Sequence, residues 1–150
     1  MSGSVLAPVR TTFRAVAETV VGEATSLSPE GWREVEAEVE AALASRPEAM
    51  QRQLVTFLRV IEYLPLLKHF RRFSRLPISA RTDVLRGFES SPRPLFRRGM
   101  WGLRTLVFLG YYTRDDVQGA LGYRAHADGW SARRTSAETR AAAAEPLGEE

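Results

Sequence analysis

The sequence predicts an all-α protein, folded as a compact orthogonal bundle of about six helices with a C-terminal tail. Three observations support this fold class. Apolar residues recur at spacings of three and four along most of the chain, which is the period of one helix face. Serine, threonine and proline stand where several of these runs begin. No alternating apolar and polar run is bounded by an Asn-Gly or Asp-Gly turn, so no β-hairpin is indicated.

The first half of the chain contains three predicted helices. The first covers residues 8–21, and the second covers residues 29–44 with Ser28 as its N-cap. Residues 45–48 resemble a capping box with proline in the first turn, and they begin a third helix that ends near Tyr63. The residues predicted to face inward are Val9, Phe13, Val16, Val20 and Val21, then Trp32, Val35, Val39 and Leu43, then Met50, Leu54, Phe57, Leu58 and Ile61.

The second half continues with shorter elements. Pro65 interrupts the helical pattern, and residues 66–73 are predicted to form one or two turns. A fourth helix is expected over residues 79–89 and a fifth over residues 94–110. Residues 113–116, Thr-Arg-Asp-Asp, are typical of another helix start, with a threonine cap and acidic residues in the first turn. This sixth helix is expected to end near Gly122.

These elements predict a single helical domain over residues 8–125. Residues 1–7 are expected to be a flexible N-terminus. Residues 126–150, which are rich in alanine, arginine and glutamate and poor in large apolar residues, are expected to be a flexible tail. Neither a signal peptide nor a membrane-spanning run is indicated, so we expect a cytoplasmic protein, with co-export beside a partner as the alternative.

Charge is segregated along the chain. Residues 1–50 contain four arginines and eight glutamates, a net charge of −4. Residues 59–104 contain eleven lysines and arginines against three acidic residues, a net charge of +8. This basic block includes Arg97 and Arg104. It could bind the phosphate groups of nucleic acid or of an anionic membrane surface, or an acidic protein partner. The remaining interpretation is a basic face that is exposed to solvent and binds nothing.

No motif indicates catalysis by this chain. The sequence has no cysteine, and its two histidines, His69 and His126, lie outside any metal-ligand spacing. It has no glycine-rich nucleotide loop and no nucleophile motif. We therefore predict no catalytic, no cofactor-binding and no metal-binding residue, and we expect a protein that is not itself an enzyme.

Aromatic residues cluster near the end of the predicted domain. Two adjacent tyrosines, Tyr111 and Tyr112, close the fifth helix, and Tyr123 follows the sixth. Adjacent residues on a helix point about 100° apart, so both cannot face the core. At least one is therefore expected at an edge, where tyrosine suits a protein interface.

Four short motifs together resemble a known family. They are Phe88-Glu89-Ser90-Ser91-Pro92, Gly102-Leu103-Arg104-Thr105-Leu106, Tyr111-Tyr112-Thr113-Arg114-Asp115-Asp116-Val117 and Gly119-Ala120-Leu121-Gly122-Tyr123. In this respect the chain resembles the gluconate 2-dehydrogenase subunit 3-like small (gamma) subunit family, over about residues 8–125. It departs from the family pattern at Gln118, where tryptophan is frequent, and in the residues after Tyr123.

The resemblance implies an accessory role. Such small subunits bind a catalytic flavoprotein of the glucose-methanol-choline type and assist its maturation or stability in a chaperone-like way. The chain would then hold no cofactor, and FAD would sit in the catalytic subunit of a hetero-oligomer. The residues expected to bind that partner are Arg97, Arg104, Tyr111, Tyr112, Leu121 and Tyr123.

Overall fold

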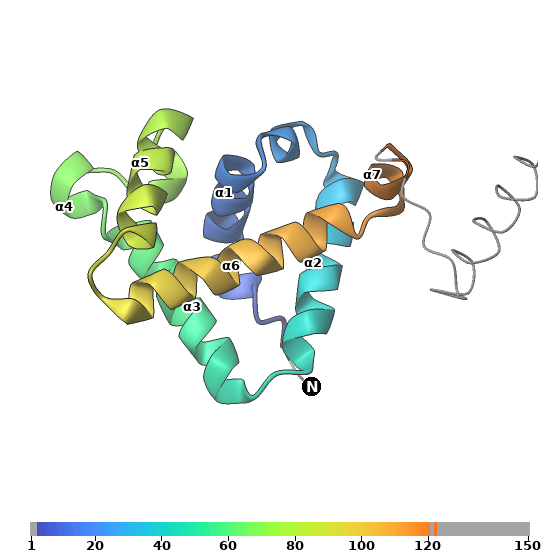
Figure 1. The fold of residues 1–150 in the computed structure, drawn as a ribbon, viewed down its shortest axis with the longest axis horizontal. Helices are drawn as coiled ribbons and strands as arrows, with labels where there is room; N and C mark the ends of the chain where they lie inside the picture. Colours follow the sequence, from blue (N-terminus) through green and yellow to red (C-terminus); the bar gives the residue numbers. More distant parts are fainter. Residues whose placement is uncertain (1–2, 121, 123–150) are drawn as a thin grey trace, which may run out of the picture. The chain divides into compact units, whose positions relative to one another are not determined.

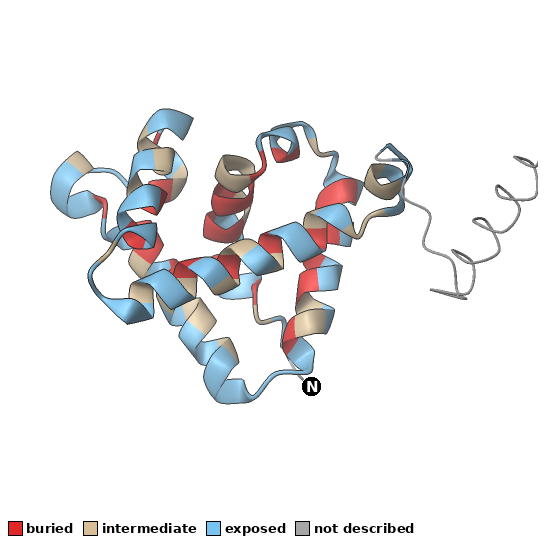
Figure 2. Ribbon diagram, in the orientation of Figure 1, coloured by how far each residue is buried: buried red, intermediate tan, exposed pale blue. Residues whose placement is uncertain are grey.

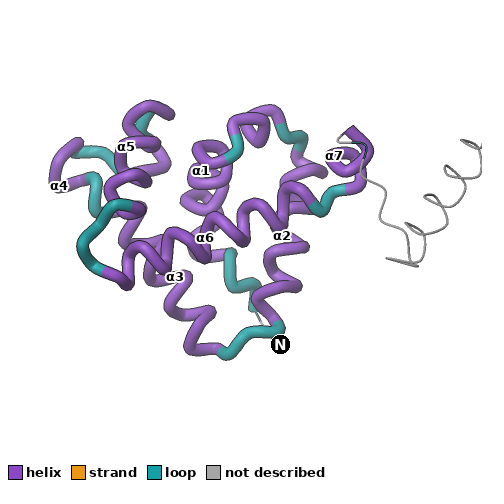
Figure 3. Tube along the Cα trace, in the orientation of Figure 1, coloured by secondary structure: helices purple, strands orange, loops and turns teal. Residues whose placement is uncertain are grey.

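A computed structural model describes residues 3–120 and residue 122, and within them every regular element is a helix (Figure 3). The predicted all-α bundle is thereby confirmed. The α-helices are α1 (Arg10–Val20), α2 (Pro29–Ala44), α3 (Glu48–Tyr63), α4 (Leu66–His69), α5 (Ile78–Glu89), α6 (Pro94–Tyr112) and α7 (Asp115–Ala120). Three short 3-10 helices join them, η1 (Ala7–Val9), η2 (Gly22–Ser26) and η3 (Phe73–Arg75).

The chain divides into two units, Met1–Val117 and Gln118–Glu150. The first unit contains α1 to α6 and every contact discussed below. Of the second unit, only residues 118–120 and 122 are described. The tail predicted over residues 126–150 therefore lies outside the described residues.

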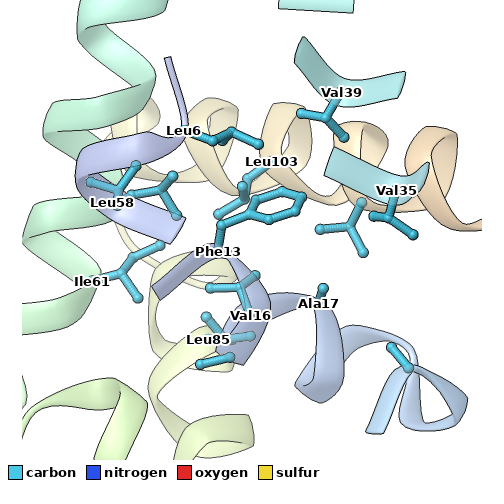
Figure 4. Close-up of a cluster of buried hydrophobic side chains, with 14 of the residues drawn as sticks. Leu6, Phe13, Val16, Ala17, Val35, Val39, Leu58, Ile61, Leu85 and Leu103 are labelled. Carbon is cyan, nitrogen blue, oxygen red and sulfur yellow. The ribbon is translucent and has the colours of Figure 1, made fainter. Parts of the chain in front are cut away.

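Helix α1 lies at the centre of the core. Its residue Phe13 is fully buried among apolar side chains from α2, α3, α5 and α6 (Figure 4). The buried positions Phe13, Val16 and Ala17 lie on one helical face, as the apolar spacing of this segment predicts. Helix α6 runs across α1, α2 and α3 (Figure 1), and its inner side contributes Leu103 and Val107 to the same core (Figure 2).

Helix α2 packs along α6 at a close crossing. A Cβ added to Gly110 of α6 would lie 2.9 Å from the carbonyl oxygen of Val35 and 2.9 Å from Cγ2 of Val39. Any side chain at this position would therefore push the two helices apart. The absence of a side chain at Gly110 sets how near the two helix backbones approach.

The sequence placed one helix start correctly and another incorrectly. The hydroxyl oxygen of Ser28 accepts a hydrogen bond of 3.1 Å from the N–H of Gly31, which confirms it as the N-cap of α2. The capping box predicted at residues 45–48 does not form, because Pro47 occupies the N-cap position of α3 without a side-chain cap. The hydroxyl of Ser45 instead donates to the carbonyl oxygen of Ala42, in the last turn of α2.

The N-terminal segment belongs to the domain from residue 4 onward. Glu40 of α2 accepts hydrogen bonds from the hydroxyl of Ser4, the N–H of Val5 and the N–H of Leu6, the last two at 3.0 and 2.7 Å. The side chain of Leu6 is buried in the core. The predicted start of the domain at residue 8 is therefore too late, because the contacts with Glu40 join distant parts of the chain and leave no local signal in the sequence.

Two carboxylates, the buried Glu62 and the half-buried Glu18, tie the helices together. Glu62 of α3 accepts hydrogen bonds from the hydroxyl of Thr12, and from the N–H and hydroxyl of Ser74 at 3.1 and 2.6 Å. Arg81 of α5 donates to the carbonyl oxygen of Ser74 and pairs with Glu18 of α1 at 3.2 Å. These groups hold α1, α3, η3 and α5 in register, so they serve the fold.

Two apolar positions of the helical pattern lie outside the core. Met50, predicted to face inward, is 49% exposed in the first turn of α3. The core-facing residues of α3 begin only at Leu54, so the first turn of this helix lies outside the core. Leu95, in the first turn of α6, is also largely exposed. Among the described residues, no helix is long and apolar enough to cross a membrane.

Candidate partner-binding surface

Helix α6 carries one buried apolar face and a second, partly aromatic face that no other element of the described residues covers. Its buried residues are Met100, Leu103, Val107 and Gly110. A second series lies on the other side of the helix, within an arc of about 100° at 100° per residue. We call it the outer α6 face, and its members are Arg97, Trp101, Arg104, Thr105, Phe108 and Tyr112.

Trp101 is the most exposed aromatic residue of this face, with 74% of its surface accessible. It lines an open hollow of about 450 Å³ together with Glu89, Arg97, Arg104, Thr105 and Phe108. Large aromatic side chains on the surface of a folded chain are typical of protein interfaces, where tryptophan is enriched among the residues that contribute most to binding. The hollow is therefore a candidate contact site.

Two arginines border this hollow in fixed positions. The Nη1 atom of Arg104 lies 2.6 Å from Oε1 of Glu89, and its Cζ atom lies 5.6 Å from the centre of the Phe108 ring. The Nη1 group of Arg97 donates to the carbonyl oxygen of Ser91 at 2.6 Å. Both guanidinium groups still have donors to offer, because each uses one of its five N–H groups in these bonds.

Both tyrosines at the end of α6 lie in one aromatic cluster. The ring centres of Phe108 and Tyr112 are 5.9 Å apart, and those of Tyr112 and Tyr111 are 5.1 Å apart in an edge-to-face arrangement. Tyr112 is 42% exposed, whereas Tyr111 packs against the core and lies under the guanidinium of Arg114. The prediction that the pair cannot both face inward is confirmed.

The phenol of Tyr111 is electrostatically distinct. Burial raises the pKa of Tyr111 above its ordinary value of 10.0, and the nearby carboxylate of Glu23 raises it further. The guanidinium of Arg114 acts in the opposite direction. The phenol of Tyr111, at the border between the core and the outer α6 face, therefore stays protonated to higher pH than a free tyrosine.

The structure brings three of the six predicted partner-binding residues onto one face. Arg97, Arg104 and Tyr112 belong to the outer α6 face, and Tyr111 lies at its border. Leu121 and Tyr123 lie outside the described residues. Trp101 and Phe108 were not among the predicted residues. Together with Tyr112 they lie at helical spacing, on the side of α6 opposite to Leu103. This second helical period in the same segment was the available signal.

The basic block divides into arginines with internal partners and cations without them. Arg81, Arg97 and Arg104 each bond to the chain itself. By contrast, Arg71 and Arg75 are exposed and make no ion pair within the described part of the chain. The outward charge of the block is therefore carried by Arg71 and Arg75 near α4, and also by the exposed residues Arg59, Arg86 and Arg98.

The described residues contain no group of three or more histidine, aspartate or glutamate side chains that could hold a metal ion. His69 is half-buried in α4, and His126 lies outside the described residues. The outer α6 face offers aromatic rings, guanidinium donors and the hydroxyls of Thr105 and Tyr112, which suit recognition of another surface. The chain matches no protein-family model, no curated protein and no solved structure. Inferences about its function therefore rest on its own residues.

Proposed function

We propose that this chain is a non-catalytic small subunit that binds, and stabilises or matures, a flavin-dependent dehydrogenase of the glucose-methanol-choline type. The chemistry of hydride transfer and the FAD cofactor would belong to that partner. The outer α6 face would be the docking surface. The single observation that supports it most is the exposed side chain of Trp101, set in a hollow between two arginines.

The chemistry of the face favours a protein partner. An exposed tryptophan beside Phe108 and Tyr112 supplies a large apolar contact with little conformational freedom to lose. The arginines add donors suited to carboxylates, so a partner with an acidic rim around an apolar centre would fit. Because Arg104 is already held by Glu89 and Phe108, less side-chain entropy is lost on binding.

The test first asks whether a neighbouring gene encodes a flavoprotein of the glucose-methanol-choline type, and then co-expresses that flavoprotein with this chain. We expect a stable complex that retains flavin. We expect Trp101→Ala to weaken the complex by about 2 kcal/mol or more, because central tryptophans dominate the energy of such interfaces. The loss is measured as a Kd by calorimetry on the purified proteins.

Leu95→Ala is the matched control, because Leu95 is equally exposed and lies on the same helix, outside the hollow. Its Kd should stay within about threefold of the wild-type value. The proposal fails if the two proteins purify separately and the flavoprotein is equally stable and active alone. The role of the outer α6 face fails if both variants weaken the complex equally.

A further inference from the structure

A second exposed surface lies around α4, at one edge of the first unit (Figure 1). We call it the α4 tip, and it consists of residues 64–72. Its Leu67 and Phe70 are 81% and 87% exposed, more than any other large apolar residue in the described part of the chain. Leu67 lies within α4, a single turn that begins after Pro65, and Phe70 follows its last residue. Most of this turn is exposed (Figure 2). Nothing in the proposed partner function involves these residues.

The backbone holds Phe70 in an unfavourable conformation. Its φ of 54° lies in the left-handed region, which glycine adopts far more readily than phenylalanine. The N–H of Phe70 donates to the carbonyl oxygen of Leu66 and so closes the turn. Because the side chain is almost fully exposed, no packing within this unit offsets the strain. A strained, uncovered aromatic side chain suggests that its contact is made with something outside the chain.

The charge around the tip has one sign. Residues 63–82 contain no acidic side chain and five basic ones. Arg81 is engaged with Glu18, and Arg72 lies over the ring of Tyr63, with its Cζ atom 5.4 Å from the ring centre. Arg71 and Arg75 are exposed. Exposed apolar side chains and exposed cations are thus concentrated in one short segment.

The nearest acidic residues do not cancel this charge. Glu62 is buried and accepts its hydrogen bonds from Thr12 and Ser74. Asp83 lies on α5, where it borders a hollow of about 350 Å³ that Lys68 also lines. Lys68 is therefore the cation that Asp83 can partly compensate, and Arg71, Arg72 and Arg75 remain to act outward.

We propose that the α4 tip binds an anionic phospholipid surface. Leu67 and Phe70 would enter the boundary between headgroups and acyl chains, and the arginines would contact the lipid phosphates and carboxylates. Interfacial segments combine apolar anchors with basic residues in this way. Nucleic acid is the weaker alternative, because phosphate and base contacts would use the arginines and Phe70 but give no role to an exposed leucine.

The test measures co-sedimentation of the full chain with vesicles. We expect binding to vesicles of equal parts phosphatidylcholine and phosphatidylserine, weakening as salt is raised, and little binding to phosphatidylcholine alone. The double variant Leu67→Ser with Phe70→Gly should bind at least about tenfold more weakly, since it removes both apolar anchors. It should remain folded by circular dichroism, because both side chains are exposed and glycine suits the positive φ at position 70.

Two double variants with the same change in net charge distinguish binding at the α4 tip from a general effect of net charge. Arg71→Gln with Arg75→Gln should weaken binding roughly 30-fold, from about 1 kcal/mol per basic residue at an anionic surface. Arg52→Gln with Arg59→Gln makes the same change in net charge on the exposed side of α3 and should have a much smaller effect.

Three results would overturn the proposal. The first is no binding to the anionic vesicles at low salt. The second is an equal loss of binding in the Arg52 and Arg59 variant and in the Arg71 and Arg75 variant, which would indicate a non-specific effect of net charge. The third is tighter binding to duplex DNA or RNA than to vesicles, unchanged in the Leu67 and Phe70 variant, which would indicate a nucleic-acid site.

Discussion

At the scale of single residues, the arginines of this chain fall into distinct roles that composition alone does not separate. Arg81 is partly buried and joins three elements through Glu18 and the carbonyl oxygen of Ser74. Arg104 is half-exposed and is held by one carboxylate and one ring. Arg71 has no such partner in the described structure. Residues with identical chemistry thus stabilise the fold, border a hollow, or present free charge, according to their surroundings.

Tyr111 provides a prediction at this scale. Its pKa is raised in the folded chain, so the folded state holds the phenol proton more tightly than the unfolded state does. The resulting stabilisation is complete below the ordinary pKa of 10.0 and is lost as pH rises from there through the raised folded value. The free energy of unfolding, measured with urea at a series of pH values, should therefore fall above about pH 10.

Tyr111→Phe is the comparison for this effect. Phenylalanine does not ionise, so the variant should lose less stability than the wild-type chain over the same alkaline range. Parallel curves for the two proteins would contradict the assignment, since they would show that Tyr111 does not contribute to the pH dependence.

At the scale of elements, α6 is the most informative helix. Its inner face is buried against α2 and the core, and its outer face carries the candidate partner surface. The position of the outer face depends on the packing of the inner face. The close approach of α6 to α2 at Gly110 fixes where the last turn of α6, with Tyr111 and Tyr112, lies. A change at this one position is therefore expected to act on both stability and binding.

We predict that Gly110→Ala destabilises the protein by about 1–2 kcal/mol. The gain in helix propensity, about 1 kcal/mol, is outweighed by overpacking against the backbone of α2, which does not move as a side chain would. Urea denaturation followed by circular dichroism measures the change. Gly102→Ala on the same helix is the control, because its added Cβ would meet no atom within 4 Å. That variant should be as stable as the wild type or more so, and destabilisation of both variants alike would exclude a specific effect at the crossing.

Most of the helices could be predicted from the sequence, because periodicity and capping are local properties. Ser28 and the bounds of α2 are an example. The contacts of Glu40 with the N-terminal segment could not be predicted, since they join residues more than thirty positions apart and depend on the tertiary fold. The outer α6 face was found only in part. The arginines and tyrosines were identified from the sequence, whereas Trp101 and Phe108 were not.

At the scale of the whole chain, two surfaces with different chemistry are present. The outer α6 face combines aromatic rings with arginines that are already held in place. The α4 tip combines apolar side chains with exposed cations, and no element of the described residues covers Leu67 or Phe70. They share no residue, so each can be removed without altering the composition of the other.

This separation gives a prediction. Trp101→Ala should weaken the complex with the flavoprotein and leave vesicle binding unchanged, and the Leu67 and Phe70 variant should do the reverse. The combined variant should show both losses at about their single-variant magnitudes, because substitutions without shared partners are usually additive to about 0.3–0.5 kcal/mol. Calorimetry and vesicle co-sedimentation on the same protein preparations measure the two effects. Loss of both activities in either variant alone would show that the surfaces are coupled.

The composition of the basic block has a practical consequence at the α4 tip. Lys68 is the sole lysine among the 150 residues, and it is exposed on α4. Amine-directed reagents modify the ammonium group of lysine but leave guanidinium groups unchanged. Among the side chains of this protein, a fluorophore attached through such a reagent would therefore label only Lys68, next to Leu67. The chain carries its own attachment point for a probe at the surface whose environment is in question.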